Sequence, residues 1–209
     1  GVYSHLADAD TPDSEHVKMQ IAGWNEMAAR TRKEFPHIKY FHLAATTGSF
    51  YAQQIDANVM RLGIGLYGIN VSLGTLDLHP ALEMRTRITS IHTLHAGESV
   101  GYNATFTASR DTRIATIPAG YAEGVDRRLS NKGPITVRGT PCPIVGRVSM
   151  NITSLDISNV ANVRVGDEAV VISSSAADGN GVEKIAKLCG TIPYEILVHI
   201  PAHLRRVVV

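Results

Sequence analysis

The chain has 209 residues, 44% hydrophobic and 19% charged, with a net charge of +1. This composition is that of a globular protein able to bury a core, and without blocks of one charge it favours neither nucleic acid nor a membrane surface as partner. No apolar run reaches the roughly 18 residues of a membrane span. Two scattered cysteines, Cys142 and Cys189, match no metal-ligand spacing, so we expect no metal site and a reducing compartment.

The first part of the chain alternates between strand and helix patterns. Residues 1–10 begin as a short strand and end in a polar loop, which places His5 at the carboxyl end of that strand. Taken alone, His5 reads as a hydrogen-bonded polar residue at a strand edge. Residues 11–15 carry helix-capping side chains, a proline and acids, as at the start of a helix. The apolar residues that follow at helical spacing, to about Arg32, are Val17, Ile21, Trp24 and Ala28.

Two further segments of this part suggest an anion site. Residues 38–44 predict a strand that runs into the hydroxyl-rich turn 45–49 and a short helix, although serine and threonine cap most helices without binding anything. Residues 59–62 predict a buried strand that carries Arg61, followed by a glycine-rich loop. Arg61 offers a rigid fork of donors, and the amides of Gly63 and Ile64 could reach a phosphate.

The pattern changes to short alternating strands near residues 74–80, where we place a domain boundary. Glycine-centred turns separate these strands, which is typical of a small closed or sandwiched β domain. A helix is predicted at 182–189, ended by Gly190, with a tight turn at 191–195. The predicted strand segments are 82–93, 100–106, 113–117, 135–137, 142–148, 152–157 and 163–173.

Five motifs in this order and spacing resemble alanine racemase, a pyridoxal-phosphate (PLP) enzyme with a (β/α)8 barrel and a C-terminal β domain. They are Ser4–Asp10, Asn58–Gly68, Val100–Phe106, Ile117–Arg128 and Val145–Asn151. The resemblance implies an α/β plus β fold: the C-terminal part of a PLP-binding barrel in residues 1–78, then a mostly-β domain in residues 79–209.

The chain is too short for a whole barrel with a β domain, since the barrel alone takes about 250 residues. In the family, the lysine that forms the Schiff base with PLP lies in the first part of the barrel, and no position here matches it. We therefore expect a C-terminal portion of a racemase that is inactive by itself. Its lysines, all in segments that read as surface helix or turn, are Lys18, Lys33, Lys39, Lys132, Lys184 and Lys187.

The resemblance implies three catalytic residues, Tyr102, His5 and Arg61. Racemisation needs a base on each face of the α-carbon, and in the family these are the PLP lysine and the tyrosine matching Tyr102. A free tyrosine has a pKa near 10, so it needs a nearby cation to act as a base near neutral pH. The family places the His5 position against this tyrosine, and the Arg61 position against His5 and the pyridine nitrogen, where an arginine keeps its proton and limits side reactions.

Other site residues are also implied by the resemblance. The cofactor contacts are Thr46, Arg61, Gly63, Ile64 and Tyr194. The substrate contacts are Tyr102 and the backbone amide of Met150. The positions lining the substrate entry are Asp10, Tyr121, Arg127, Arg147 and Ile192. The sequence departs from the family at two of its motifs: Ala45-Thr46 stands where the family has Asn-Ser, and Asn151 stands where it has aspartate.

We therefore expect a cytoplasmic racemase that interconverts L- and D-alanine for cell-wall supply, with a small amino acid as substrate and PLP as cofactor. The family implies a homodimer in which each Tyr102 serves the other subunit's barrel. Because Asn151 removes a charge near the substrate, a racemase for another small amino acid, such as serine, is the first alternative. The second is a β-domain oligomerisation module without activity.

Overall fold

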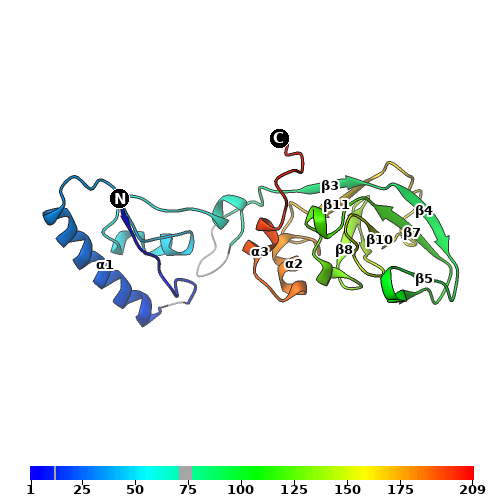
Figure 1. Ribbon diagram of the computed structural model, residues 1–209, viewed down its shortest axis with the longest axis horizontal. Helices are drawn as coiled ribbons and strands as arrows, with labels where there is room; N and C mark the ends of the chain where they lie inside the picture. The colour runs from blue at the N-terminus through cyan, green and yellow to red at the C-terminus, as the bar shows by residue number, and fades with distance from the viewer. Residues whose placement is uncertain (12, 71–76) are drawn as a thin grey trace. The chain divides into compact units, whose positions relative to one another are not determined.

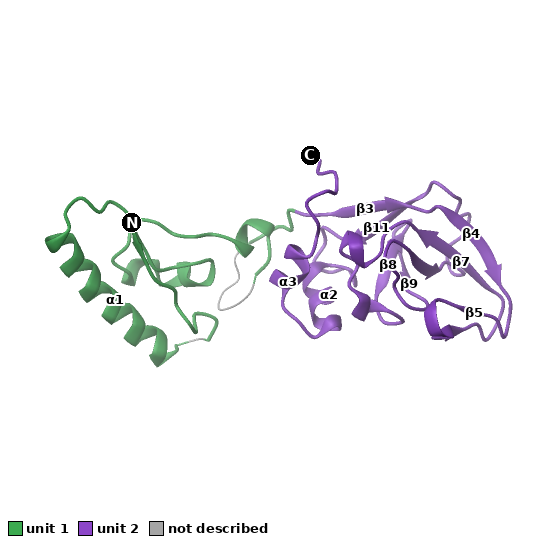
Figure 2. Ribbon diagram, viewed as in Figure 1, with its two compact units in different colours: residues 1–81 green, residues 82–209 purple. Residues whose placement is uncertain are grey.

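The computed structural model describes residues 1–11, 13–70 and 77–209, and it contains two compact units, Gly1–Ala81 and Leu82–Val209 (Figure 2). The predicted domain boundary near residues 74–80 falls partly outside the described residues. No helix among the described residues is both long enough and apolar enough to cross a membrane.

The first unit is built on two parallel strands joined through a helix (Figure 1). β1 (Val2–Tyr3) pairs with β2 (Phe41–His42), and α1 (Glu15–Glu34) connects them in sequence. Parallel neighbours need such a crossover, so the predicted alternation of strand and helix is confirmed here. The second strand is shorter than the predicted 38–44, and a single parallel bridge between Ala45 and Arg61 continues the pairing.

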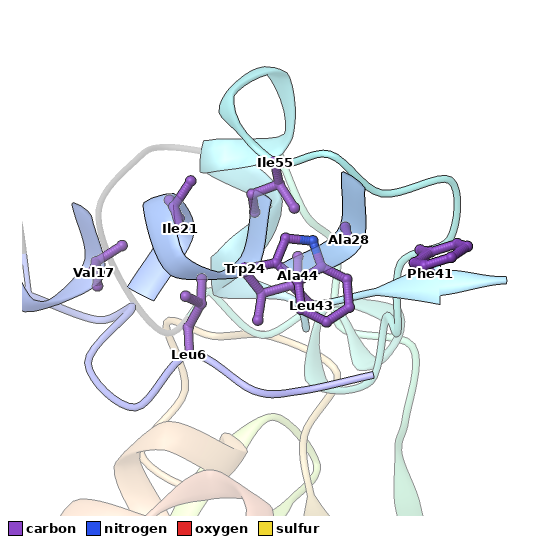
Figure 3. Packing of buried hydrophobic residues seen from close by; sticks show 9 residues of the cluster. All are labelled: Leu6, Val17, Ile21, Trp24, Ala28, Phe41, Leu43, Ala44 and Ile55. Atoms are coloured by element: carbon purple, nitrogen blue, oxygen red, sulfur yellow. The ribbon is translucent and has the colours of Figure 1, made fainter. Parts of the chain in front are cut away.

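α1 forms because an apolar stripe at helical spacing follows a capping serine. The Ser14 hydroxyl accepts a hydrogen bond from the Val17 amide at 3.4 Å, and the Trp24 indole donates to the Asp56 carbonyl at 3.0 Å. Burial of each large apolar side chain contributes roughly 1.5–3 kcal/mol. The buried core of this unit, which includes the whole predicted stripe, is shown in Figure 3: Leu6, Val17, Ile21, Trp24, Ala28, Phe41, Leu43, Ala44 and Ile55.

The prediction of a buried strand at 59–62 is wrong. Met60 is 45% exposed and Leu62 is 51% exposed, because the pairing of this segment is limited to the bridge at Arg61. The turn before it opens a 3₁₀ helix, η1 (Thr47–Gln54), and the glycine-rich loop after it forms a second, η2 (Ile64–Tyr67).

The second unit is mostly β, as predicted, and its strands form antiparallel sheets. One sheet has the order β10-β7-β4, another the order β3-β11-β8-β9, and β5 pairs with β6. The strands are β3 (Met84–Arg87), β4 (Ser90–Leu94), β5 (Ser99–Val100), β6 (Phe106–Thr107), β7 (Thr112–Ile117), β8 (Pro134–Val137), β9 (Thr140–Pro143), β10 (Thr153–Asp156) and β11 (Glu168–Ile172). The inward-facing residues fully buried between them include Ile114, Ile117, Ile135, Leu155 and Ile172.

Helices close this unit at its C-terminal end. α2 (Val182–Cys189) matches its prediction, and Gly190, at φ 67°, ends it in the left-handed conformation. The predicted tight turn at 191–195 is wrong, because α3 (Pro193–Val198) begins within it. Pro193 suits a first helical turn, and the Thr191 hydroxyl donates to the Glu195 carboxylate across that turn.

Candidate active site

In the first unit, the candidate site centres on the guanidinium of Arg61. Its Nη2 lies 3.0 Å from His5 Nδ1 and donates to the carbonyls of Ser4 at 2.8 Å and Leu43 at 3.1 Å. Its Nη1 lies 2.8 Å from His42 Nδ1 and donates to the His42 carbonyl at 3.1 Å. The carboxyl ends of β1 and β2 supply these acceptors, so the parallel pairing of the strands brings them together around Arg61.

These contacts determine where the imidazole protons lie. A guanidinium has only donors, so the Nδ1 atoms of His5 and His42 both accept from Arg61, and each ring carries its proton on Nε2. The His42 ring also stacks on Tyr3, with 5.3 Å between ring centroids. Arg61 therefore orients both imidazoles through their Nδ1 atoms and leaves the Nε2 atoms for other partners.

The predicted phosphate contacts in this unit gather around Thr46. The Thr46 hydroxyl accepts from the amides of Gly63 at 3.0 Å and Gly65 at 3.3 Å. A Cβ on Gly65 would lie 2.8 Å from Thr46 Cγ2, so the loop must be glycine there to pack this closely. With both lone pairs used, the hydroxyl has its proton left to donate, and Ile64 follows directly at the start of η2.

In the second unit, Tyr102 lies on a strained turn and not on the strand predicted for 100–106. β5 ends at Val100, and Tyr102 begins the 3₁₀ turn η3 (Tyr102–Ala104), where its side chain is 69% exposed. Gly101 precedes it at φ 85°, and a Cβ there would lie 2.8 Å from the Arg147 amide. Close packing of Gly101 against Arg147 therefore fixes where the tyrosine leaves the fold.

Residues 149–151, called the Met150 segment, are bonded to a second turn, η4 (Tyr121–Glu123). The amide of Tyr121 donates to the Ser149 carbonyl at 3.0 Å, and that of Ala122 donates to the Met150 carbonyl at 2.9 Å. The Glu123 carboxylate accepts from the Gly120 amide at 2.8 Å and from the Asn151 side-chain amide at 2.7 Å. These bonds set the position of the Met150 backbone, whose side chain is 57% exposed.

Tyr121 and Arg127 line one pocket of about 270 Å³ in this unit, together with Asp126, Ile196 and His199. Arg127 begins η5 (Arg127–Leu129), which a cluster of charges joins to α3.

In that cluster, the Arg128 guanidinium bonds the Asp126 carboxylate at 2.6 and 3.0 Å and the Glu195 carboxylate at 2.9 Å. The bond from Arg128 holds the pKa of Asp126 below its ordinary value, and the bonds from Thr191, first, and Arg128 do the same for Glu195. These bonds position α3, where Tyr194 is 44% exposed and the preceding Ile192 is 59% exposed.

The predicted site residues thus form two sets. His5, Arg61, Thr46, Gly63 and Ile64 belong to the first unit, with Asp10 in the loop after β1. The second unit holds the tyrosine turn, the Met150 segment and the pocket at α3. Arg147 is half-buried there, and its Nε atom is buried without a hydrogen-bond partner among the described residues. The roles of all these residues stay predictions.

Sequence reasoning missed two residues of these sets. His42 bonds Arg61 as His5 does, and its position at the end of a second parallel strand was the available signal. Glu123 contacts Asn151, and its place three residues after Gly120, as in a capping box, could have predicted the bond to the Gly120 amide.

Two family models cover the chain. Residues 1–71 match the alanine racemase N-terminal domain, and residues 81–208 match the alanine racemase C-terminal domain. The chain belongs to the alanine racemase family. The alanine racemase of Syntrophobacter fumaroxidans is 38% identical over 94% of this chain and 53% of its own length, and that of Sorangium cellulosum is 36% identical over 99% and 56%. The chain therefore spans about half the length of these curated relatives.

Solved alanine racemases share the fold. The enzyme from Streptomyces coelicolor has a TM-score of 0.88 at 27% identity, covering 98% of this chain and 55% of its own. The enzyme from Bartonella henselae, solved with covalently bound pyridoxal phosphate, has a TM-score of 0.84 at 27% identity, covering 99% and 55%.

Proposed function

We propose that this chain is part of a PLP-dependent racemase that interconverts L- and D-alanine for cell-wall synthesis. Residues 1–78 would be the C-terminal part of a PLP-binding (β/α)8 barrel, and residues 79–209 the C-terminal β domain. The observation that carries the proposal is the Arg61 guanidinium, held by three carbonyls and two imidazoles at the carboxyl ends of parallel strands. Barrel enzymes place their chemistry at these strand ends.

The donors of the first unit fit a cofactor with a phosphate and a pyridine ring. The Thr46 hydroxyl, with both lone pairs occupied by the amides of Gly63 and Gly65, has a proton to donate to a phosphate oxygen. The Ile64 amide is a further donor, and Tyr194 would add a phenol from the second unit. Arg61 would face the pyridine nitrogen. PLP, when bound, would delocalise the electron pair left after the α-proton is removed.

Within this proposal, the chain's own residues hold and move one proton. Tyr102 takes the α-proton on one face, or returns it, through its hydroxyl. Because Arg61 fixes the His5 proton on Nε2, that N–H can donate to the phenolate of Tyr102 and favour its charged form. The Met150 amide would bind the substrate carboxylate, and the entry would be lined by Asp10, Tyr121, Arg127, Arg147 and Ile192.

The assembly we propose is a homodimer in which Tyr102 of one protomer meets His5 and Arg61 of its partner. The exposure of Tyr102 on its turn supports this, since a base needs a partner that favours its charged form. The free thiols of Cys142 and Cys189 are in keeping with the cytoplasm.

The lysine that attaches PLP covalently lies, in this proposal, outside these 209 residues. All six lysines of the chain are exposed, whereas such a lysine must be held beside the ring. The chain by itself should therefore not racemise alanine. The β-domain module without activity is the weaker alternative, because the N-terminal racemase model matches residues 1–71 in addition to the C-terminal model at residues 81–208.

The test is racemisation by the protein made from the complete gene, purified with PLP. Conversion of L-alanine to D-alanine, followed by chiral chromatography, should be faster than conversion of L-serine at equal concentrations. The 209-residue chain is the matched control and should convert neither amino acid. Activity on serine alone would replace alanine as the substrate, and no activity on either would refute the proposal.

A further inference from the structure

We propose that Glu123 is a positioning residue whose carboxylate holds Asn151, and with it the Met150 segment, against η4. This inference rests on the proposed function, in which Met150 contacts the substrate carboxylate. Two observations carry it: one oxygen of the Glu123 carboxylate lies 2.7 Å from the Asn151 side-chain amide, and the other lies 2.8 Å from the Gly120 amide.

The geometry makes the two positions interdependent. One oxygen of Glu123 accepts from the Gly120 amide at 2.8 Å, at the start of η4, while the other accepts from Asn151 Nδ2. The carboxylate thus joins η4 to the Met150 segment. An aspartate at 151 would bring two carboxylates into contact, which raises the pKa of one of them and removes the hydrogen bond. Asparagine at 151 is therefore the residue that fits glutamate at 123.

Backbone packing makes this side-chain bond matter for Met150. A Cβ on Gly120 would lie 2.2 Å from the Ser149 carbonyl oxygen and 2.4 Å from that of Met150, so η4 and this segment are packed backbone to backbone. A displacement of the Asn151 end therefore moves the Met150 backbone. The other charged side chains on the two segments are Asp126, Arg127, Arg128 and Arg147, and among the described residues none forms an ion pair with Glu123.

The bond pattern predicts that the charge can be exchanged between the two positions. A glutamine at 123 can accept from the Gly120 amide with Oε1 and donate from Nε2 to an aspartate at 151. The double variant Glu123→Gln/Asn151→Asp keeps one carboxylate and both hydrogen bonds. The single variant Asn151→Asp has two carboxylates and loses one bond.

The test uses the protein made from the complete gene. Asn151→Asp should raise KM for alanine about two- to fivefold, the range of a screened charge pair near the surface, with a smaller change in kcat. Adding Glu123→Gln should return KM to the wild-type value. The matched control is Asn151→Asp with Glu183→Gln on α2, which should restore nothing.

A second readout needs no activity. Asn151→Asp should lower Tm more near about pH 8 than near about pH 5, because one carboxylate of the pair takes up a proton as the pH falls. The double variant should lose this pH dependence. The inference is wrong if Asn151→Asp changes neither KM nor Tm, or if adding Glu123→Gln restores neither of them. In that case the proposed function still holds, provided that the wild type racemises alanine. If the wild type racemises nothing, the function fails and the Tm comparison alone decides the inference.

Discussion

Arg61 Nη2 lies 3.0 Å from His5 Nδ1. Because a guanidinium has only N–H donors, Arg61 donates this hydrogen bond and His5 accepts it. The two residues are 56 positions apart: His5 follows β1, and Arg61 forms the isolated bridge with Ala45. Their contact determines the ring orientation and the tautomer of His5 together. The positive charge of Arg61 and the Nε2–H donor of His5 are thereby combined at one edge of the first unit.

Replacing Arg61 with lysine should destabilise the first unit and reduce racemisation. A lysine cannot reproduce the planar fork that serves both imidazoles and the carbonyls of Ser4 and Leu43. The buried Leu43 carbonyl, left without a partner, costs roughly 1–3 kcal/mol, whereas the exposed acceptors of Ser4 and His5 can bond water and cost less. Urea unfolding should show the loss, with Arg30→Lys on α1 as the control, since Arg30 is exposed and, within the described part of the chain, its ion pair is with Glu34. Equal stability of Arg61→Lys and wild type would contradict this account of the cluster.

Tyr102→Phe in the complete protein should reduce racemisation without preventing PLP binding. Removing one general base costs on the order of 10²- to 10⁴-fold. Because the proposed mechanism uses a different base on each face of the α-carbon, exchange of the α-proton with deuterium should fall much more for one enantiomer than for the other. Tyr40→Phe, at another exposed tyrosine, is the control and should leave both rates unchanged. Normal rates in both directions for Tyr102→Phe would assign this tyrosine to packing.

Gly101→Ala should displace the turn that carries Tyr102. Gly97→Ala is the control that separates the effect of backbone strain from the effect of the new Cβ approaching Arg147. Both glycines have positive φ values, 85° and 89°, so each alanine adds backbone strain of roughly 1–3 kcal/mol. Only at 101 does the new Cβ also approach another segment, at 2.8 Å from the Arg147 amide. Gly101→Ala should therefore lower Tm further than Gly97→Ala and alone reduce activity. Equal effects on Tm and activity would show that the contact with Arg147 is unimportant.

Arg128→Gln should lower Tm near neutral pH and have less effect in acid. The bond from Arg128 holds the pKa of Asp126 below its ordinary value, and the bonds from Thr191, first, and Arg128 hold the pKa of Glu195 below its own. These carboxylates therefore stabilise the fold above their unfolded pKa values, near about 4. That contribution is lost as the pH falls through the lowered, folded pKa values. The Tm difference between wild type and variant should be greatest above about pH 5 and shrink below about pH 4. Arg30→Gln is the surface control, and a difference independent of pH would refute the electrostatic explanation.

Elements specified by neighbouring residues could be predicted from the sequence. α1 and α2 follow from apolar spacing with a cap at Ser14 and a stop at Gly190, all within a few turns of chain. The 59–62 segment could not be predicted correctly, because burial of an apolar strand depends on what pairs with it and not on its own residues. The single bridge at Arg61 leaves Met60 and Leu62 exposed.

The candidate site also has a part that could be predicted from the sequence and a part that could not. Arg61 and Tyr102 stand in motifs that a resemblance can match, but their surroundings come from distant segments. His42 lies 19 residues from Arg61, and Glu123 lies 28 residues from Asn151, so neither contact has a local pattern. The turn under Tyr102 depends on the packing of Gly101 against Arg147, which alternating hydrophobicity does not encode.

The shared donor Arg61 gives the two histidines unequal freedom to change during evolution. At position 42 the ring accepts a hydrogen bond from Arg61 through Nδ1 and stacks on Tyr3. An asparagine side-chain oxygen can lie near the place of Nδ1, so a substitution of His42 by asparagine would keep the hydrogen bond to Arg61. At position 5 the ring accepts a hydrogen bond from Arg61 through Nδ1 and, in the proposed function, donates one to Tyr102 through Nε2. Imidazole is the side chain that offers an acceptor and a donor nitrogen in one rigid plane. Lineages of this family should therefore vary first at the histidine that ends the second strand.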